Sequence, residues 1–492
     1  MLFNSIGFLI YFIIVIIGYF LIPKNKVWIW LLGASYYFYI QWNIKYALLM
    51  FLSTLITYIS GIVIDQINKK YDKKQKLYKK IILIISLFLN LSILFFFKYY
   101  NFIGKSILEV AQTLKFKLDL PMLDLILPVG ISFYTFQALS YTLDVYKEDI
   151  EAEYHLGKYS LFVSFFPQLV AGPIERSTNL LPQIKIGKNF DYDRLRQGLL
   201  IMGFGFFKKI VIADRLAVIS NQIFENPTHY SGILLIIGVM CFSFQIYCDF
   251  SGYSDIAIGC AKVMGYDLME NFNKPYFSKT IGEFWRRWHI SLGMWFKDYL
   301  YIPLGGKYNG KLKYYRNLLI VFFISGLWHG ASWNFAIWGL IHAIYQIIGE
   351  ESKEYKILII NKLKINSKGR VYKNFQILTT FILVTIAWIF FRANTFNDVM
   401  YILNYILKDI TKLESKDLLR LGLDKKDLLV CLSSVIGLLF VEKYDIKNKI
   451  IQNICSTNIL IRWGVYYSLI MVIIVLGYYG ESSIAEFIYF QF

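Results

Sequence analysis

Residues 5–22 read SIGFLIYFIIVIIGYFLI, a run that contains no charged side chain. A helix of about 20 predominantly apolar residues is long enough to cross the hydrocarbon core of a bilayer. No basic residue precedes the run and no small-residue cleavage site follows it, so we expect a permanent span and not a removed signal peptide. This stretch therefore predicts a membrane protein.

The composition of the whole chain supports the same fold class. Of its 492 residues, 57% are hydrophobic and only 17% are charged, and the mean hydropathy is +0.47. Further stretches long enough to span are residues 27–44, 45–64, 81–103, 230–248, 316–349 (room for two short spans), 375–392, 428–441 and 459–478, with weaker ones at 125–145, 156–174 and 196–213. We predict an all-α polytopic membrane protein with roughly ten to twelve transmembrane or re-entrant helices.

The net charge of +18 is concentrated in loops, which argues against nucleic acid as a partner and for a lipid bilayer. Seven lysines lie within residues 69–80, so the positive-inside rule predicts a cytosolic loop over residues 65–80. Three spans precede this loop, which places the N-terminus outside. Residues 481–492 contain no Lys or Arg whereas Arg462 precedes the last span, so we expect the C-terminus to be extracytoplasmic as well.

Motifs typical of soluble enzymes are missing from the chain. The five cysteines show no Cys-x-x-Cys spacing, so we expect small buried side chains and neither a disulfide framework nor a metal site. No His-Glu-x-x-His occurs, and residues 305–312 only approach a P-loop because the final Ser/Thr is missing. No histidine has an aspartate five positions on, which removes the signature of the glycerolipid acyltransferases. We predict no permanently bound cofactor.

Two histidines lie in aromatic, glycine-rich surroundings. His289 belongs to residues 285–306, where two arginines, a lysine and an aspartate interrupt a row of aromatics, and His329 belongs to residues 326–334. A histidine inside an apolar chain can be a hydrogen-bonded core residue. An ionisable group retained at membrane depth is nevertheless costly, and imidazole moves protons near neutral pH, so both histidines are candidates for catalysis.

A set of motifs carries a resemblance to a known family. They are Leu127–Gln137 (LPVGISFYTFQ), Phe166–Pro173 (FPQLVAGP), Tyr247–Asp255 (YCDFSGYSD), Asn271–Tyr276 (NFNKPY) and the two histidine segments. In order and wording they resemble the membrane-bound O-acyltransferase family, especially the bacterial branch of the alginate O-acetylation membrane protein, which exports acetyl groups to polysaccharides. The resemblance covers about residues 1–480 and implies a single transmembrane domain around a central tunnel.

The resemblance also implies roles for particular residues. His329 falls on the family's catalytic histidine, and His289 falls on its companion position. His342 follows thirteen residues after His329, about 20 Å along a continuous helix, so we predict a structural role for it. After the turn at Gly305–Gly306, a cytosolic basic rim of Lys307, Lys311, Lys313 and Arg316 could hold the phosphates of coenzyme A, although an ordinary positive-inside loop would look the same.

The last six residues, 487–492, read FIYFQF. An aromatic tail can anchor in the membrane interface. This one also resembles the C-terminal hexapeptide of the small membrane partner in lipoteichoic-acid D-alanylation, in which a tyrosine carries the acyl group. That resemblance makes Tyr489 a candidate first acyl acceptor.

The resemblance implies an acyl relay across the bacterial plasma membrane. Acetyl-CoA is the expected cytosolic donor, His329 takes the proton of the attacking hydroxyl, and His289 orients that hydroxyl or stabilises the oxyanion. An extracytoplasmic partner resembling serine-esterase-type acetyltransferases would pass the group to a polysaccharide or to its synthase complex. The alternatives are D-alanyl transfer to teichoic acid, a transporter or flippase of an envelope precursor, and a non-catalytic scaffold.

Overall fold

The computed structural model describes residues 1–70, 75–170, 172–308, 310–408, 421–444, 446–479 and 487–488, and these contain helices and no strand. The chain divides into two compact units. The first comprises Met1–Leu199 and Ala257–Met269, and the second comprises Leu200–Ile256 and Glu270–Phe492. Two helices, α10 (Tyr192–Phe206) and α12 (Ile233–Met264), contribute residues to both.

Five of the helical segments in the described ranges are long and apolar enough to cross a membrane. They are α3 (Ile44–Asn68), the segment Lys76–Thr113, α12, α18 (Arg370–Arg392) and α23 (Ile459–Leu476). The helices α1 (Ile6–Leu21) and α2 (Val27–Ile40) are apolar but shorter. The predicted all-α, multi-pass membrane protein is confirmed, while the total number of crossings stays a prediction.

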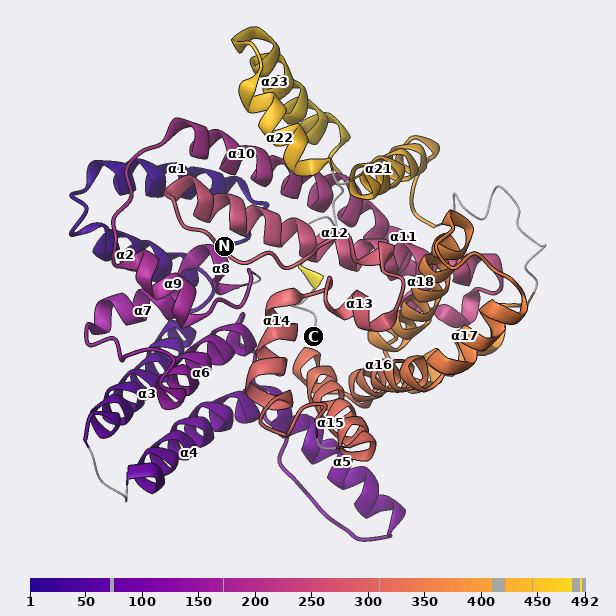
Figure 1. The fold of residues 1–492 in the computed structure, drawn as a ribbon, viewed down its shortest axis with the longest axis horizontal. Helices are drawn as coiled ribbons and strands as arrows, with labels where there is room; N and C mark the ends of the chain where they lie inside the picture. The colour runs from indigo at the N-terminus through magenta and orange to yellow at the C-terminus, as the bar shows by residue number, and fades with distance from the viewer. Residues whose placement is uncertain are drawn as a thin grey trace. The chain divides into compact units, whose positions relative to one another are not determined.

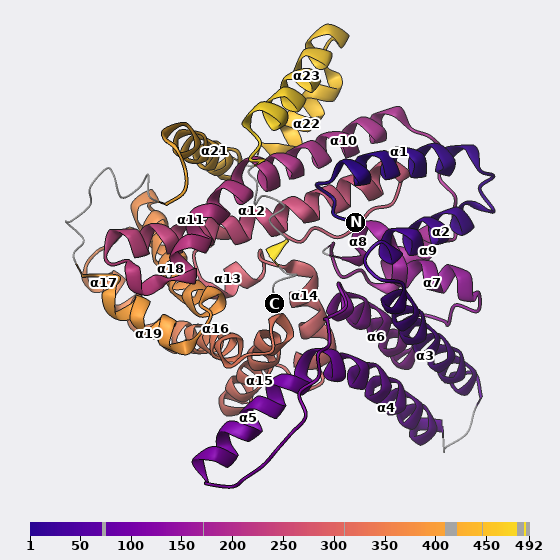
Figure 2. The ribbon, with the colours of Figure 1, turned by 180° about the vertical axis from the view of Figure 1, so that it is seen from behind.

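In the first unit, α3 packs against α4 (Gln75–Leu94) and α6 (Ile131–Lys147), and α4 also contacts α6 (Figure 1, Figure 2). The remaining helices of this unit include the π-helical turn η1 (Phe95–Tyr99), α5 (Tyr100–Thr113), α7 (Leu156–Ser164), α8 (Phe166–Leu169) and α9 (Ser177–Ile184). The predicted stretch 81–103 thus continues through α4 and η1 into α5. The weaker stretches 125–145 and 156–174 coincide with α6 and with α7–α8.

In the second unit, α15 (Lys311–His329) and α16 (Trp333–Glu351) form a tight antiparallel hairpin (Figure 1). Two glycines allow the close approach. A Cβ on Gly326 would lie 2.2 Å from the Phe335 carbonyl oxygen, and one on Gly339 would lie 2.1 Å from that of Phe322. A side chain at either position would force the two helices apart, and the end of α15, where His329 lies, would move with them.

Helix α18 packs on α16 and completes an aromatic core. Trp288, Trp338 and Trp388 are fully buried, and the Trp388 ring centroid lies 5.0 Å from that of Trp288 and 5.6 Å from that of Trp338. Such pairs stabilise by about 0.5–1.5 kcal/mol beyond the area that they bury. Further elements here are η2 (Phe207–Ala213), α11 (Asp214–Glu225), η3 (Pro227–His229), η4 (Pro275–Phe277), α13 (Ile281–Trp285), α14 (Ile290–Phe296), η5 (Lys297–Tyr301), α17 (Lys353–Lys362), α19 (Phe396–Tyr405), α21 (Lys425–Lys443) and α22 (Lys447–Ser456).

Candidate active site

His289 lies in the short connection between α13 and α14, with a left-handed backbone at φ 43°. A non-glycine residue rarely adopts this conformation, so the surrounding structure must hold it. The backbone of Asn271 and Asn273 does so. The Ile290 N–H donates to the Asn271 carbonyl at 3.0 Å, and the Asn273 N–H donates to the Arg287 carbonyl at 2.9 Å.

The side chain of Asn271 orients the His289 ring. Its Oδ1 accepts from the Ser291 backbone N–H at 3.3 Å and from Ser291 Oγ at 2.7 Å, and it lies 3.3 Å from His289 Nδ1. A backbone N–H can only donate, so the amide oxygen must face this group of atoms. His289 therefore carries its proton on Nδ1 and presents the lone pair of Nε2.

Burial controls the charge of His289. The residue is 1% exposed, and the Phe250 ring lies edge-on to the imidazole with centroids 4.7 Å apart. His289 is outside the five long apolar helices, and desolvation lowers its pKa to about 3. The imidazole is therefore neutral at pH 7 and can accept a proton or a hydrogen bond at Nε2.

His329, 3% exposed, lies at the C-terminal end of α15 inside an aromatic enclosure. Its ring centroid is 5.0 Å from that of Trp328, 5.1 Å from that of Trp338 and 5.5 Å from that of Phe391. The His289 and His329 ring centroids are 6.3 Å apart. The fold thus brings together the two histidines selected from the sequence, although forty residues separate them.

His342 requires a correction. The separation of about 20 Å assumed one continuous helix, but α15 ends at His329 and α16 turns back from Trp333. The Trp338 ring contacts both imidazoles, with centroids 5.1 Å from His329 and 5.1 Å from His342. His342 is fully buried in this aromatic layer, and its structural role stays a prediction.

The basic rim lies at the start of α15, away from the buried rings. Lys307 pairs with Glu350 at 3.1 Å and Lys311 with Glu351 at 3.3 Å, and all four side chains are largely exposed. The guanidinium of Arg316 donates to Asn317 Oδ1 at 2.8 Å, and Lys313 is exposed. Acidic side chains of α16 therefore offset part of the charge available to a phosphate group.

A group of ion pairs, buried except for the half-buried Lys447, was missed by the sequence reasoning. Lys208 Nζ lies 2.6 Å from Asp255 Oδ2, and Lys447 Nζ lies 2.7 Å from Asp255 Oδ1. Lys209 Nζ lies 2.7 Å from Asp249 Oδ1 and 2.9 Å from Asp214 Oδ1. The signal was available, because buried charges in an apolar helix need partners and both Asp249 and Asp255 lie in the long apolar helix α12.

The C-terminal tail enters this interior. Phe487 is 0% exposed and Ile488 is 1% exposed. The Phe487 ring packs against Phe250, the residue that also contacts His289, with Phe250 and Phe487 centroids 5.8 Å apart. Tyr489 lies outside the described residues.

Comparison with known proteins identifies the architecture. A family model described as membrane-bound O-acyltransferase matches residues 148–393, which include both histidine segments. The chain belongs to this family. A probable alginate O-acetylase, AlgI, of Pseudomonas aeruginosa is 38% identical over 80% of this chain and 72% of its own length. A peptidoglycan O-acetyltransferase of Helicobacter pylori is 37% identical over 82% of this chain and 79% of its own length.

A third relative, a teichoic acid D-alanyltransferase of Bacillus subtilis, is 31% identical over 49% of this chain and 65% of its own length. The resemblance seen in the sequence is confirmed. The protein is a membrane-embedded O-acyltransferase, which favours an enzyme over the transporter and scaffold alternatives.

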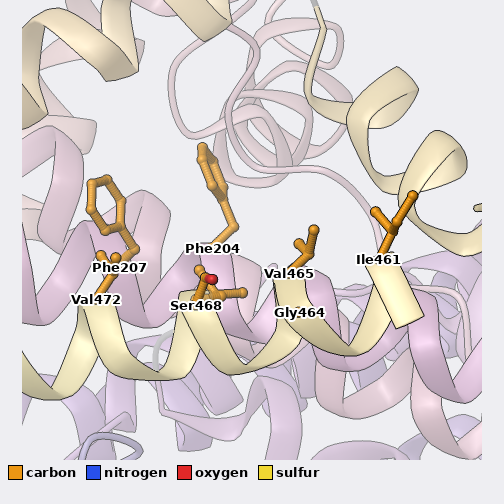
Figure 3. A pocket seen from close by; sticks show the side chains of 8 residues that line it. Phe204, Phe207, Ile461, Gly464, Val465, Ser468 and Val472 are labelled. Atoms are coloured by element: carbon orange, nitrogen blue, oxygen red, sulfur yellow. The ribbon is translucent and has the colours of Figure 1, made fainter. Parts of the chain in front are cut away.

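The O-acyltransferase also carries an apolar groove of about 490 Å³ away from the histidines. Figure 3 shows Phe204 and Phe207 facing one side of α23, and Ser468 is the one polar side chain in the lining. The lining residues are Phe204, Phe207, Ile461, Gly464, Val465, Ser468, Leu469 and Val472. Without a titratable group, this groove offers no acid–base chemistry for acyl transfer.

Proposed function

We propose that this O-acyltransferase takes an acetyl group from cytosolic acetyl-CoA, transfers it to Tyr489 at the two histidines, and thereby moves it toward an extracytoplasmic polysaccharide. One observation carries the proposal. Phe487 and Ile488 are both buried, and the Phe487 ring packs against Phe250, which contacts His289. Tyr489 follows Ile488 by one peptide bond. A tail that served only as an interfacial anchor would have no reason to be buried against the aromatic residue that contacts His289.

The chemistry requires a base, because the phenol of tyrosine has an ordinary pKa of about 10. His329 takes this proton while the phenol oxygen attacks the thioester carbonyl. The bond from carbon to sulfur then breaks, the coenzyme A thiolate leaves and collects the proton, and an acetyl ester of Tyr489 remains. A hydroxyl of the next acceptor displaces Tyr489 in the second step.

The sequence left two roles open for His289, namely orienting the attacking hydroxyl or stabilising the oxyanion, and the geometry favours the first. Its Nδ1–H is directed at Asn271, so the neutral ring has only an acceptor left at Nε2. An acceptor can orient the attacking hydroxyl but cannot donate to an oxyanion. We therefore assign to His289 the orientation of the hydroxyl.

The remaining parts of the proposal concern location and partners. We place the protein in the bacterial cell membrane with both termini outside, and we expect the rim of Lys307, Lys311, Lys313 and Arg316 on the cytosolic side to attract the phosphates of the donor. An extracytoplasmic serine-esterase-like transferase takes the acetyl group from Tyr489 to the polysaccharide. The printed activities of the alginate and peptidoglycan relatives support acetyl as the group and a polysaccharide as the destination.

The test is Tyr489→Phe, which removes one oxygen and keeps the ring. We expect transfer to polysaccharide to be lost, and mass spectrometry of the wild-type tail to show one added acetyl when acetyl-CoA is supplied without the partner. Tyr479→Phe is the matched control, because Tyr479 is exposed and its hydroxyl donates to the Ile473 backbone carbonyl of α23 at 3.0 Å. Full activity of Tyr489→Phe, or of a chain ending at Glu486, would reject the relay.

D-alanyl transfer to teichoic acid is the second candidate. The D-alanyltransferase relative and the resemblance of residues 487–492 to the tail of a D-alanylation partner both favour it. The same spectrum separates the two candidates, because acetyl and D-alanyl groups add different masses to Tyr489.

A further inference from the structure

We infer that Asp249 is the residue that docks the C-terminal tail and so positions it at the histidines. This inference rests on the proposed function for its purpose, namely delivery of an acyl-carrying tyrosine. The docking itself is a separate physical claim, and it can be tested without any acyl transfer.

The central contact is one hydrogen bond. The backbone N–H of Ile488 donates to Asp249 Oδ2 at 2.9 Å, and both residues are almost fully buried. A backbone N–H that loses water must find a partner inside the protein. A hydrogen bond from such a donor to a carboxylate is roughly twice as strong as one to a neutral acceptor.

Asp249 is itself held in place by a lysine. Its Oδ1 pairs with Lys209 Nζ at 2.7 Å, so the two carboxylate oxygens are divided between the lysine and the tail. Lys209 lies on η2, a π-helical turn, and it also pairs with Asp214 at 2.9 Å. Short π segments inside helices frequently occur at functional sites.

An aromatic contact fixes the tail beside this hydrogen bond. The Phe487 ring centroid lies 4.2 Å from that of Tyr253 and 5.8 Å from that of Phe250. Asp249 and Tyr253 are four residues apart and share one face of α12. The same short segment of α12 therefore docks the tail and, through Phe250, contacts His289.

Asp255 shows what a purely structural aspartate looks like in this helix. It pairs with Lys208 and Lys447 through its two oxygens, and both partners are lysine side chains. Asp249 differs because its second oxygen accepts from the main chain of the tail. A hydrogen bond to the main chain tolerates different tail side chains while fixing where the chain runs.

The first test compares Asp249→Ala with Asp214→Ala in the full-length protein in lipid nanodiscs. Each variant leaves Lys209 with the other of these two carboxylates, and within the described part of the tail Asp249 is the one of the two that accepts from Ile488. We expect hydrogen exchange in the C-terminal peptide to accelerate about tenfold or more in Asp249→Ala, which is the loss of one charge-assisted bond, and to be unchanged in Asp214→Ala. Equal exchange in the two variants would overturn the inference.

The second test leaves the buried charges intact. Ile488→Pro removes the donating N–H, and it also fixes φ and shortens the buried side chain. Ile488→Leu keeps the N–H and tests the change of side chain, so it serves as the control. We expect Ile488→Pro to lower acetylation of the tail about tenfold at unchanged protein abundance, and addition of Asp249→Ala to lower it no further, because both changes remove the same bond. Wild-type acetylation of Ile488→Pro would contradict the docking.

The two hypotheses fail differently. Exchange protection that depends on Asp249, in a tail that never becomes acetylated, would keep the docking and reject Tyr489 as the acceptor. An acetylated Tyr489 in a tail whose protection is indifferent to Asp249→Ala would keep the relay and reject the docking.

Discussion

The buried interior and the exposed basic rim of the second unit use the same kinds of charged residues in opposite ways. In the interior, Lys209 is 1% exposed and lies 2.7 Å from Asp249. At the rim, Lys307 is 62% exposed and lies 3.1 Å from Glu350. Breaking a buried pair costs about 3–5 kcal/mol, whereas an exposed pair contributes about 0–1 kcal/mol and is screened by salt. The geometry of the site should therefore depend on the interior, and the rim should only modulate the approach of the donor.

The largest expected effect is that of His329→Ala. Loss of a positioned base should slow acyl transfer by about 100-fold or more, with membrane insertion and abundance nearly unchanged, as measured by polysaccharide acetylation and by protein level. The exposed His229→Ala is the control. His289→Ala should also be severely impaired. Near wild-type acetylation in His329→Ala, combined with loss in His289→Ala, would mean that His289 and not His329 is the base.

Asn271→Ala should have the next largest effect. It removes the acceptor that sets the tautomer and ring orientation of His289, so we expect the rate of acetylation to fall about tenfold. The control is Asn90→Ala, since that buried amide of α4 in the first unit accepts from Ser53 Oγ and donates to the Ser86 carbonyl. An equal loss in both variants would show that the effect is one of folding and not of tautomer.

The smallest effect is expected at the rim. Changing Lys307, Lys311 and Lys313 together to Gln should raise the apparent KM for acetyl-CoA about threefold at low ionic strength, and the difference should vanish at high salt because exposed charges are screened. The control is the same triple change at the exposed residues Lys353, Lys356 and Lys362 of α17. An effect that is large and independent of salt would mean that the rim binds the donor directly.

Much of the fold could be predicted from local sequence. Each apolar stretch recognised by length and composition coincides with a helix, as residues 375–392 do with α18 and residues 459–478 with α23. A helix can span the membrane when about 20 consecutive residues are apolar and satisfy their backbone hydrogen bonds within the helix. A short window of sequence is therefore enough to predict a span. The turn at residues 330–332 was less visible, and for that reason the separation of His329 and His342 was calculated along one continuous helix that the structure does not contain.

The chemical candidates were likewise local. His289 and His329 stand out because imidazoles are rare and costly in an apolar chain, and their motifs resemble a family. The polar contacts made around this site join residues that are distant in sequence. Asn271 orients His289 across eighteen residues, and Asp249 holds Ile488 across 239 residues. No periodicity or spacing encodes contacts of that range.

The sequence by itself determined that this chain enters a membrane as helices, carries two histidines suited to proton transfer and belongs to an acyltransferase family. Only the tertiary structure decided that Asn271 faces His289 and that aromatic rings surround His329. The physical reason is that a membrane-spanning helix depends on the apolar character of consecutive residues, which a short window of sequence shows. A buried hydrogen bond or ion pair instead forms between whichever donor and acceptor the packed helices bring within about 3 Å.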